Sequence, residues 1–332
     1  MHRGLISSWR RVLLGQVFMA AACAGVPVAA SEEGLVFSQI WGYVFKGEER
    51  SLTGFETISD VGYFSAAVND IGRLDQPPAR PSFSDKTGCL QRIHLVISAP
   101  ANRSLMYWCL AKDLQTREGL IRDIVAAGRE FDGVQIDFES IRPQEGQAYL
   151  TFLKDLKAAL PAGKVLSVAV PARTKRQEDA YDYSAIGAIA DKVLVMAYDE
   201  HWRTGAPGPI ASNEWCRKVC RFAGQSVPSD KLVMGLPLYG RVWQVDEVAR
   251  ALRYPDTLDL IKRCEKNPSR TEDGVPFFQF QTTVKAEVYY EDLTSLTAKL
   301  RLYRDEGMEA VGFWRVGQGP AALWMRLSVG EP

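Results

Sequence analysis

The stretch Phe131-Asp132-Gly133-Val134-Gln135-Ile136-Asp137-Phe138-Glu139 decides the fold of this chain. Side chains of a β-strand alternate between two faces, so its apolar residues share one face while Gln135, Asp137 and Glu139 share the other. One face packs against helices and the other fills a barrel interior. Polar side chains are costly there, because a buried carboxylate must be hydrogen-bonded or paired. We therefore expect this polar column to perform chemistry.

Short apolar runs recur on both sides of this stretch and alternate with segments of helical period. This order is typical of a parallel sheet built from strand-helix units, and eight such units close into a (β/α)8 barrel of the TIM type. It argues against the alternative that 133–139 is an edge strand of an antiparallel sheet with a solvated polar face. We expect the strands at residues 36–44, 58–68, 93–99, 133–139, 165–170, 193–199, 232–239 and 310–315.

Helices are predicted between several of these strands. Apolar residues three and four apart predict helices over 120–128, 149–160 and 293–303. The stretch 243–287 is longer than one crossover helix needs, so a small insertion is expected after strand seven. The fold class is therefore α/β, with residues 31–332 forming one barrel that carries this insertion.

The first thirty residues have the order of a secretory signal peptide: three arginines without an acid, an apolar run, and small residues before Ser31. The interpretation as an uncleaved anchor helix is disfavoured, because Gly15, Gln16 and Pro27 interrupt a run shorter than a membrane span. A lipid-modified Cys23 is a second alternative. We expect a secreted or periplasmic protein with no transmembrane segment in the mature chain.

The charge of the chain bears on its partners. Forty Lys and Arg residues balance forty Asp and Glu residues, and removal of residues 1–30 leaves 37 against 40. The chain thus lacks the excess positive charge of a nucleic-acid-binding protein. We expect an uncharged partner, no nucleic acid, and a monomer.

Several kinds of site are disfavoured by residues that the chain lacks. Only His94 and His201 follow the leader, which argues against a histidine-rich metal centre. The motifs of serine hydrolases, phosphate-binding loops and dinucleotide sites do not occur. Cys216 and Cys220, four apart, have no nearby histidine and are interpreted as small buried hydrophobic residues. We therefore expect no metal and no cofactor.

Asp137 and Glu139 form a candidate acid pair. Two residues of strand separate them by about 6.6 Å, so their side chains can interact. Two like charges this close disfavour joint ionisation, and one carboxyl should keep its proton near neutral pH. Glu139 lies nearer the C-terminal end of the strand, where barrel active sites lie, and is the better proton donor.

These residues resemble a known family. The stretch from Asp132 to Glu139 is similar to the D-x-x-D-x-D-x-E signature of glycoside hydrolase family 18, the chitinases and their relatives, and the likeness is closest to the spore-germination, peptidoglycan-acting branch. Further segments resemble motifs of this family in the same order: 195–202, 205–210, 235–240, 289–292 and 312–315.

The resemblance implies a substrate-assisted mechanism with retention of configuration, an exception to the two-carboxylate rule for glycosidases. It implies that Glu139 protonates the glycosidic oxygen while the sugar's own acetamido carbonyl attacks the anomeric carbon. Asp137 would bind the acetamido N–H and offset the positive charge that forms. Tyr198 matches the tyrosine that donates to the acetamido oxygen.

The resemblance also implies the residues that bind the glycan. Asp199 matches a substrate-contacting position, and Met196 would wall the acetamido pocket. Trp314 would form the platform on which the sugar stacks, with Tyr239 and Tyr43 at the mouth. The expected partner is a polysaccharide that contains N-acetylglucosamine.

One position departs from the family signature. Gln135 replaces its second aspartate, which removes a possible charge beside Asp137 and predicts an altered pH optimum. A glutamine there can still hydrogen-bond Asp137. Two functions stay open: a hydrolase, and a lectin-like barrel that binds glycans without cutting them. Intact Glu139, Asp137 and Tyr198 favour the hydrolase.

Overall fold

A computed structural model describes residues 34–75, 79–83, 89–99, 102–112, 114–139, 141–244, 249–281 and 285–331. The expected signal peptide at residues 1–30, including Cys23, lies outside these ranges. Over the residues that are described, no helix is both long and apolar enough to cross a membrane.

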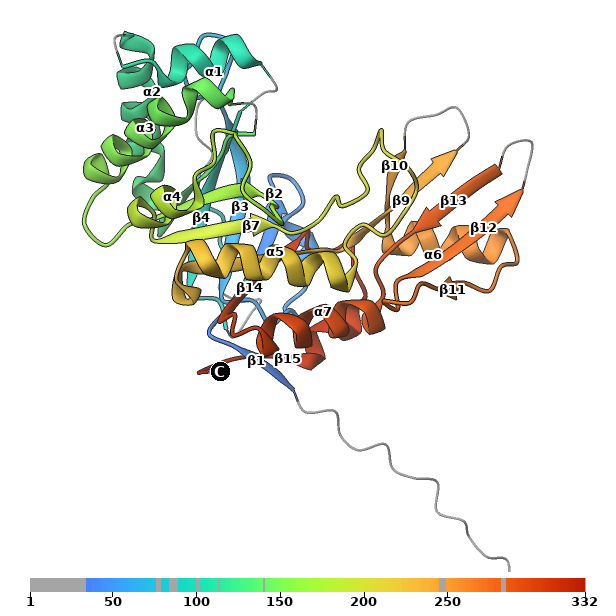
Figure 1. Cartoon of the computed structure of the whole chain (residues 1–332). Helices are drawn as coiled ribbons and strands as arrows, with labels where there is room; N and C mark the ends of the chain where they lie inside the picture. The colour runs from blue at the N-terminus through green and yellow to red at the C-terminus, as the bar shows by residue number, and fades with distance from the viewer. Residues whose placement is uncertain are drawn as a thin grey trace, which may run out of the picture. The chain divides into compact units, whose positions relative to one another are not determined.

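Eight parallel strands close into a barrel in the order β14-β2-β3-β4-β5-β6-β7-β8 (Figure 1). Each of the eight expected strands is present. Their bounds are β2 Gln39–Phe45, β3 Asp60–Ala67, β4 Arg92–Ser98, β5 Gly133–Asp137, β6 Val165–Pro171, β7 Lys192–Met196, β8 Leu232–Pro237 and β14 Ala310–Trp314. The predicted (β/α)8 barrel is confirmed.

Helices return the chain between the barrel strands and cover the outside of the barrel (Figure 1). They are α1 Arg103–Leu110, α2 Gln115–Ala127, α3 Gly146–Ala159, α4 Tyr183–Ile189, α5 Asn213–Ser226 and α7 Leu293–Asp305. Single 3₁₀ turns lie at Glu49–Ser51, Gly128–Glu130, Pro143–Glu145 and Ser229–Lys231, and a longer one at Ala321–Arg326. Four α-helices begin at a residue whose side chain accepts from a backbone N–H of the first turn: Asn102, Asp182, Ser212 and Asp292.

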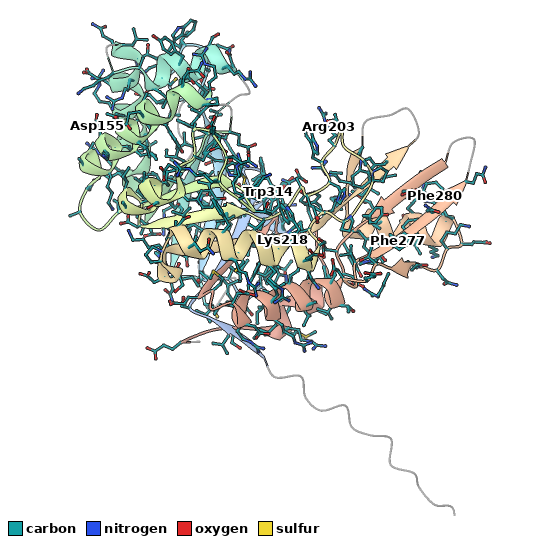
Figure 2. The ribbon with its side chains drawn as sticks, in the orientation of Figure 1. Asp155, Arg203, Lys218, Phe277, Phe280 and Trp314 are labelled. Carbon is teal, nitrogen blue, oxygen red and sulfur yellow. The ribbon has the colours of Figure 1, made fainter. Side chains whose placement is uncertain are left out.

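The insertion after the seventh barrel strand is an antiparallel sheet in the order β10-β9-β13-β12-β11, with one helix packed on it. Its elements are β9 Tyr239–Gln244, β10 Arg250–Arg253, α6 Tyr254–Arg263, β11 Ser269–Arg270, β12 Pro276–Gln281 and β13 Lys285–Tyr289. Figure 2 shows Phe277 and Phe280 on this sheet, away from Trp314 in the barrel.

The insertion sheet begins earlier than expected. We placed Tyr239 at the end of the seventh barrel strand, but β8 ends at Pro237. Leu238 N–H then donates to Trp314 O at 2.7 Å, and Tyr239 pairs with Arg253 as the first residue of β9. Tyr239 therefore reaches the mouth of the barrel from the insertion.

The first expected strand also differs. Residues 36–44 contain a break at Ser38, whose N–H and hydroxyl both bond to Glu309 O. The part before the break, β1 Leu35–Phe37, leaves the barrel and pairs in parallel with β15 Leu327–Val329. The two ends of the described chain are thus joined.

The main core lies between the barrel and its helices, and it includes Cys216 and Cys220 on α5. Both thiols are fully buried, which confirms that they are small core residues. A smaller cluster, to which Trp41 and Tyr43 belong, fills the barrel interior. The barrel interior beneath the active-site end is therefore filled by packed side chains.

Candidate active site

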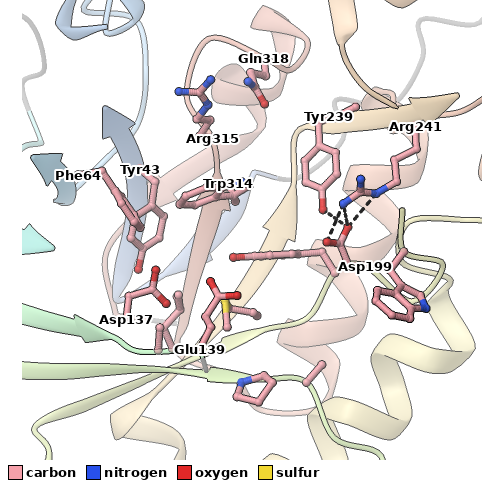
Figure 3. A pocket seen from close by; sticks show the side chains of 18 of the residues that line it. Tyr43, Phe64, Asp137, Glu139, Asp199, Tyr239, Arg241, Trp314, Arg315 and Gln318 are labelled. Carbon is pink, nitrogen blue, oxygen red and sulfur yellow. Dashed lines mark hydrogen bonds and ion pairs between the residues drawn. The ribbon is translucent and has the colours of Figure 1, made fainter. Parts of the chain in front are cut away.

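A cavity of about 680 Å³ opens where the barrel strands end and the insertion begins (Figure 3). All nine residues that the sequence analysis singled out line it: Tyr43, Gln135, Asp137, Glu139, Met196, Tyr198, Asp199, Tyr239 and Trp314. They come from four barrel strands, the loops that follow two of them, and β9. The structure brings them together, and their individual roles stay predictions.

Asp137 is the last residue of β5, and Glu139 lies just beyond the end of that strand. Asp137 is only 7% exposed. Its burial, and then the charge of Glu139, raise the pKa of Asp137 to about 7. Glu139 faces the open cavity, yet the protein around it, and then the charge of Asp199, raise the pKa of Glu139 above its usual value. Both carboxyls can therefore carry a proton at higher pH than an exposed acid does.

The surroundings of Asp137 differ from our expectation. Gln135 donates from Nε2 to Ser167 Oγ at 3.1 Å on the neighbouring strand β6, rather than to Asp137. Within the described residues, Asp137 Oδ1 has no hydrogen-bond partner. Oδ1 is therefore a buried carboxyl oxygen that a ligand N–H can satisfy.

Asp199 faces the cavity because its backbone is left-handed, with φ of 61°. In a regular strand it would point away from the face that carries Tyr198. Arg241 on β9 holds the carboxylate through Nη2, at 2.6 Å from Oδ1 and 2.7 Å from Oδ2, and the Tyr239 hydroxyl donates to Oδ1. The insertion thus fixes the acid whose charge acts on Glu139.

Aromatic rings form one wall of the cavity. The Trp314 ring contacts the rings of Phe64 at 4.9 Å, Phe45 at 5.6 Å, Tyr43 at 5.7 Å and Tyr198 at 6.5 Å between centroids. Aromatic faces of this kind stack against the apolar face of a sugar ring. Trp314 belongs to this wall, as a sugar platform would.

Sequence reasoning missed part of the lining. Phe45 is the last residue of β2 and Phe64 lies within β3, and strand alternation alone could have placed them on the cavity face. Trp202, which the sequence analysis did not single out, also lines the cavity and is 61% exposed. Two arginines of the lining were also missed: Arg241 binds the Asp199 carboxylate, and Arg315 binds that of Glu48.

Asp132, the first residue of the family signature, has a structural role. It lies outside the cavity, and its Oδ2 accepts from Ile93 N–H at 2.8 Å and from Arg80 at 2.6 Å. Across the described ranges, no group of three or more His, Cys, Asp or Glu side chains is arranged to hold a metal ion.

A known protein family matches most of this chain. The sequence profile of Glycosyl hydrolases family 18 matches residues 92–319, more than half of the chain. The chain belongs to glycosyl hydrolase family 18. The resemblance inferred from its motifs is therefore confirmed.

Individual family 18 proteins are similar to this one. YdhD of Bacillus subtilis, named as a sporulation-specific glycosylase, is 34% identical over 210 residues, 60% of this chain and 50% of the relative. The cortical fragment-lytic enzyme of Bacillus anthracis is 27% identical over 224 residues, 63% of this chain and 52% of the enzyme. The chain thus spans about half the length of these two relatives.

A solved chitinase structure shows the same fold. The chitinase from Chromobacterium violaceum superposes with a TM-score of 0.77 at 22% identity, over 87% of this chain and 97% of the chitinase. The similarity covers nearly the whole chitinase chain.

Proposed function

We propose that this family 18 protein is an exported glycosidase. It cleaves β-linked glycans that contain N-acetylglucosamine, of the peptidoglycan or chitin type, with retention of anomeric configuration. One observation carries the proposal: Glu139, with a raised pKa, faces an aromatic-walled cavity beside the buried carboxyl of Asp137, whose Oδ1 has no hydrogen-bond partner among the described residues.

The first step uses Glu139 as general acid. Its proton passes to the glycosidic oxygen as the bond from that oxygen to the anomeric carbon breaks. The sugar's own acetamido oxygen attacks the anomeric carbon from the other face and forms a cyclic oxazolinium ion. Glu139, now a carboxylate, then takes a proton from water as the water opens the ring, which restores both the acid and the original anomer.

Asp137 and Tyr198 stabilise the acetamido group during this step. The free oxygen of Asp137 accepts from the acetamido N–H, and its negative charge offsets the charge of the oxazolinium ion. Tyr198 lines the same cavity and has a hydroxyl donor for the acetamido oxygen. The strand order supports this assignment. Asp137 ends β5 and Tyr198 follows β7, and these two strands lie on either side of β6, so both side chains can reach one acetamido group.

Replacement of the acid tests the proposal. Glu139→Gln keeps the shape of the side chain and loses the transferable proton, so turnover should fall about 10²- to 10⁴-fold while glycan binding persists. Turnover is measured by mass spectrometry of products from peptidoglycan and chitin oligomers. Asp305→Asn, a surface acid change, serves as control. Undiminished turnover of Glu139→Gln would contradict the role of Glu139 as general acid.

A second experiment separates substrate assistance from attack by Asp137. If the acetamido group attacks, a thiazoline mimic of the oxazolinium ion should inhibit and de-N-acetylated substrate should not react. If Asp137 attacks, a 2-fluoro sugar should trap a covalent adduct on it. A trapped aspartyl adduct would therefore show that Asp137 is the nucleophile and contradict its role as the partner of the acetamido N–H.

The alternative function is a lectin-like barrel of the same family. It predicts glycan binding with no products from any N-acetylglucosamine polymer. The presence of Glu139, Asp137 and Tyr198 in one cavity favours the hydrolase.

Export is part of the proposal and rests on the sequence of residues 1–30, which has the arginines, apolar run and small residues of a cleaved leader. A peptidoglycan or chitin substrate also lies outside the cytoplasm.

A further inference from the structure

A second group of polar side chains lines the same cavity away from the acids. Figure 3 shows Arg315 and Gln318 on the opposite side of Trp314 from Asp137 and Glu139. Arg253 and Leu252 on β10 line the cavity with them. The proposed reaction gives these side chains no role.

Arg315 is held in one orientation. Its guanidinium carbon lies 4.5 Å from the centre of the Phe45 ring, and Nη1 donates to Glu48. With its amide oxygen turned toward the guanidinium, Gln318 accepts from Arg315 Nε at 3.0 Å and from Nη2 at 3.2 Å. The Gln318 NH₂ group then points away from Arg315 as a further donor.

Arg253 lies next to this group. The N–H of the following residue, Tyr254, donates to Gln318 O at 2.8 Å and ties β10 to the turn after Trp314. Arg253 bonds Asp256 through Nε at 2.8 Å and Nη2 at 3.0 Å, with its side chain 63% exposed. An ion pair this exposed contributes little stability, so a ligand can replace Asp256.

In this group of side chains, the positive residues line the cavity and their negative partners do not. Arg253 and Arg315 are both lining residues of the cavity, whereas their acidic partners Asp256 and Glu48 are not. The balanced charge of the whole chain favoured an uncharged partner, but this end of the cavity presents cations. A carboxylate that replaces Asp256 matches the planar guanidinium of Arg253 with two parallel hydrogen bonds. Arg315, whose Nε and Nη2 donate to Gln318, contributes its positive charge. A neutral glycan offers hydroxyls, which do not match this pair of donors.

We propose that Arg253, Arg315 and Gln318 form a subsite for a carboxylate on the glycan. The inference rests on the proposed function and specifies its substrate class: an N-acetylated glycan with acidic substituents, rather than uncharged chitin. Because Arg315 directly follows Trp314, the carboxylate belongs to the sugar stacked on Trp314 or to its neighbour. In peptidoglycan it comes either from the lactyl group of N-acetylmuramic acid or from the peptide attached there.

The test compares three tetrasaccharides of alternating N-acetylglucosamine and N-acetylmuramic acid. One has free lactyl carboxylates, one has these groups converted to uncharged methylamides, and one carries an L-alanyl-D-glutamate peptide. Binding is measured by calorimetry on the full chain with Glu139→Gln, so that no glycan is cut. We expect a charged form to bind at least about tenfold more tightly than the methylamide.

Substitutions then assign the preference to the subsite. Adding Arg253→Gln or Arg315→Gln to the Glu139→Gln protein should reduce the ratio of the two affinities toward one. Adding Arg122→Gln, an exposed arginine on α2, should leave the ratio unchanged. Arg253 is exposed, so its substitution keeps the test valid if the Arg315 variant does not fold. A tighter free acid identifies the lactyl group, and a tighter peptide form identifies the peptide.

The outcomes separate this inference from the proposed function. Equal affinity for charged and methylamide forms, or a preference that survives both arginine substitutions, overturns the carboxylate subsite and leaves the glycosidase intact. A charge preference without cleavage by the unsubstituted protein supports the subsite and contradicts the hydrolase. Absence of both binding and cleavage for all N-acetylglucosamine glycans overturns both.

Discussion

At the scale of single residues, Asp199 affects the pKa of Glu139, the proposed general acid. Its left-handed backbone turns the carboxylate into the cavity, where its charge is one cause of the raised pKa of Glu139. Arg241 keeps Asp199 in place and also partly compensates its charge. The pKa of Glu139 therefore depends on a group that comes from the next strand but one.

Asp199→Asn should consequently lower the pKa of Glu139. The loss of a negative charge, with Arg241 left unpaired, favours the ionised acid. Since the reaction needs protonated Glu139, the alkaline limb of the kcat/KM profile should move to lower pH. The measurement is kcat/KM against pH for both proteins. An alkaline limb that stays in place or moves to higher pH would contradict the role of Asp199.

Asp137 should make stability depend on pH. Its folded pKa, about 7, lies above the ordinary value of 3.8. The folded state therefore binds the proton more tightly, so stability is fully present below about pH 4 and is lost as pH rises to about 7. Asp137→Asn removes this loss, on the order of a few kcal/mol, while it slows turnover.

The measurement is urea unfolding at pH 4.5 and pH 8 for both proteins. The free energy of unfolding should fall more between these values in the native chain than in Asp137→Asn. Parallel pH dependence of the two proteins would show that Asp137 titrates normally.

Much of the site could be predicted from sequence at this scale. Strand alternation placed Gln135, Asp137 and Glu139 on one face, and the resemblance to the family supplied the other six cavity residues that were predicted. The orientation of Asp199 could not be predicted, since it depends on the φ angle of one residue. The bond from Gln135 to Ser167 could not be predicted either, because the acceptor that lies opposite a buried amide depends on the register of two strands.

At the scale of elements, a buried ion pair fastens the insertion to the barrel. Glu291 follows β13, and Lys299 lies on α7. Both are essentially inaccessible to solvent, and Nζ lies 2.8 Å from Oε2. Burial raises the pKa of Glu291, and Lys299 acts in the opposite direction. Each charge therefore depends on the other.

Lys299→Met should destabilise the protein by about 3–5 kcal/mol, because it leaves a buried carboxyl without its partner. The double variant Glu291→Leu with Lys299→Met removes both charges and should recover most of that loss. Urea unfolding of the three proteins measures the difference. A double variant as unstable as Lys299→Met would mean that packing, rather than the unpaired acid, causes the loss.

The elements themselves could largely be predicted, because periodicity distinguishes strands from helices over runs of this length. The ends could not. Tyr239 continues an apolar run, so sequence alone assigned it to the seventh strand, whereas antiparallel pairing with Arg253 assigns it to β9. The break at Ser38 likewise depends on Glu309, which is distant in sequence.

At the scale of the whole molecule, the pairing of β1 with β15 joins the two ends of the described chain. Leu35 and Phe37 of β1 are buried, so this strand belongs to the fold. Cleavage after Ala30 would leave β1 intact. The proposed leader and the folded unit, which begins at Gly34, are therefore compatible.

The exported protein should accordingly begin at or close to Ser31. The small residues before this position suit cleavage by a signal peptidase. Ala30→Arg, which places a large charge at the residue before the cut, should block processing. Ala29→Arg, one position further back, should be tolerated and is the matched control. Mass spectrometry of the secreted protein and of its N-terminal peptide measures the outcome. A secreted chain that begins at Met1 would contradict the leader, and an acylated Cys23 would replace the secreted protein by a membrane-anchored one.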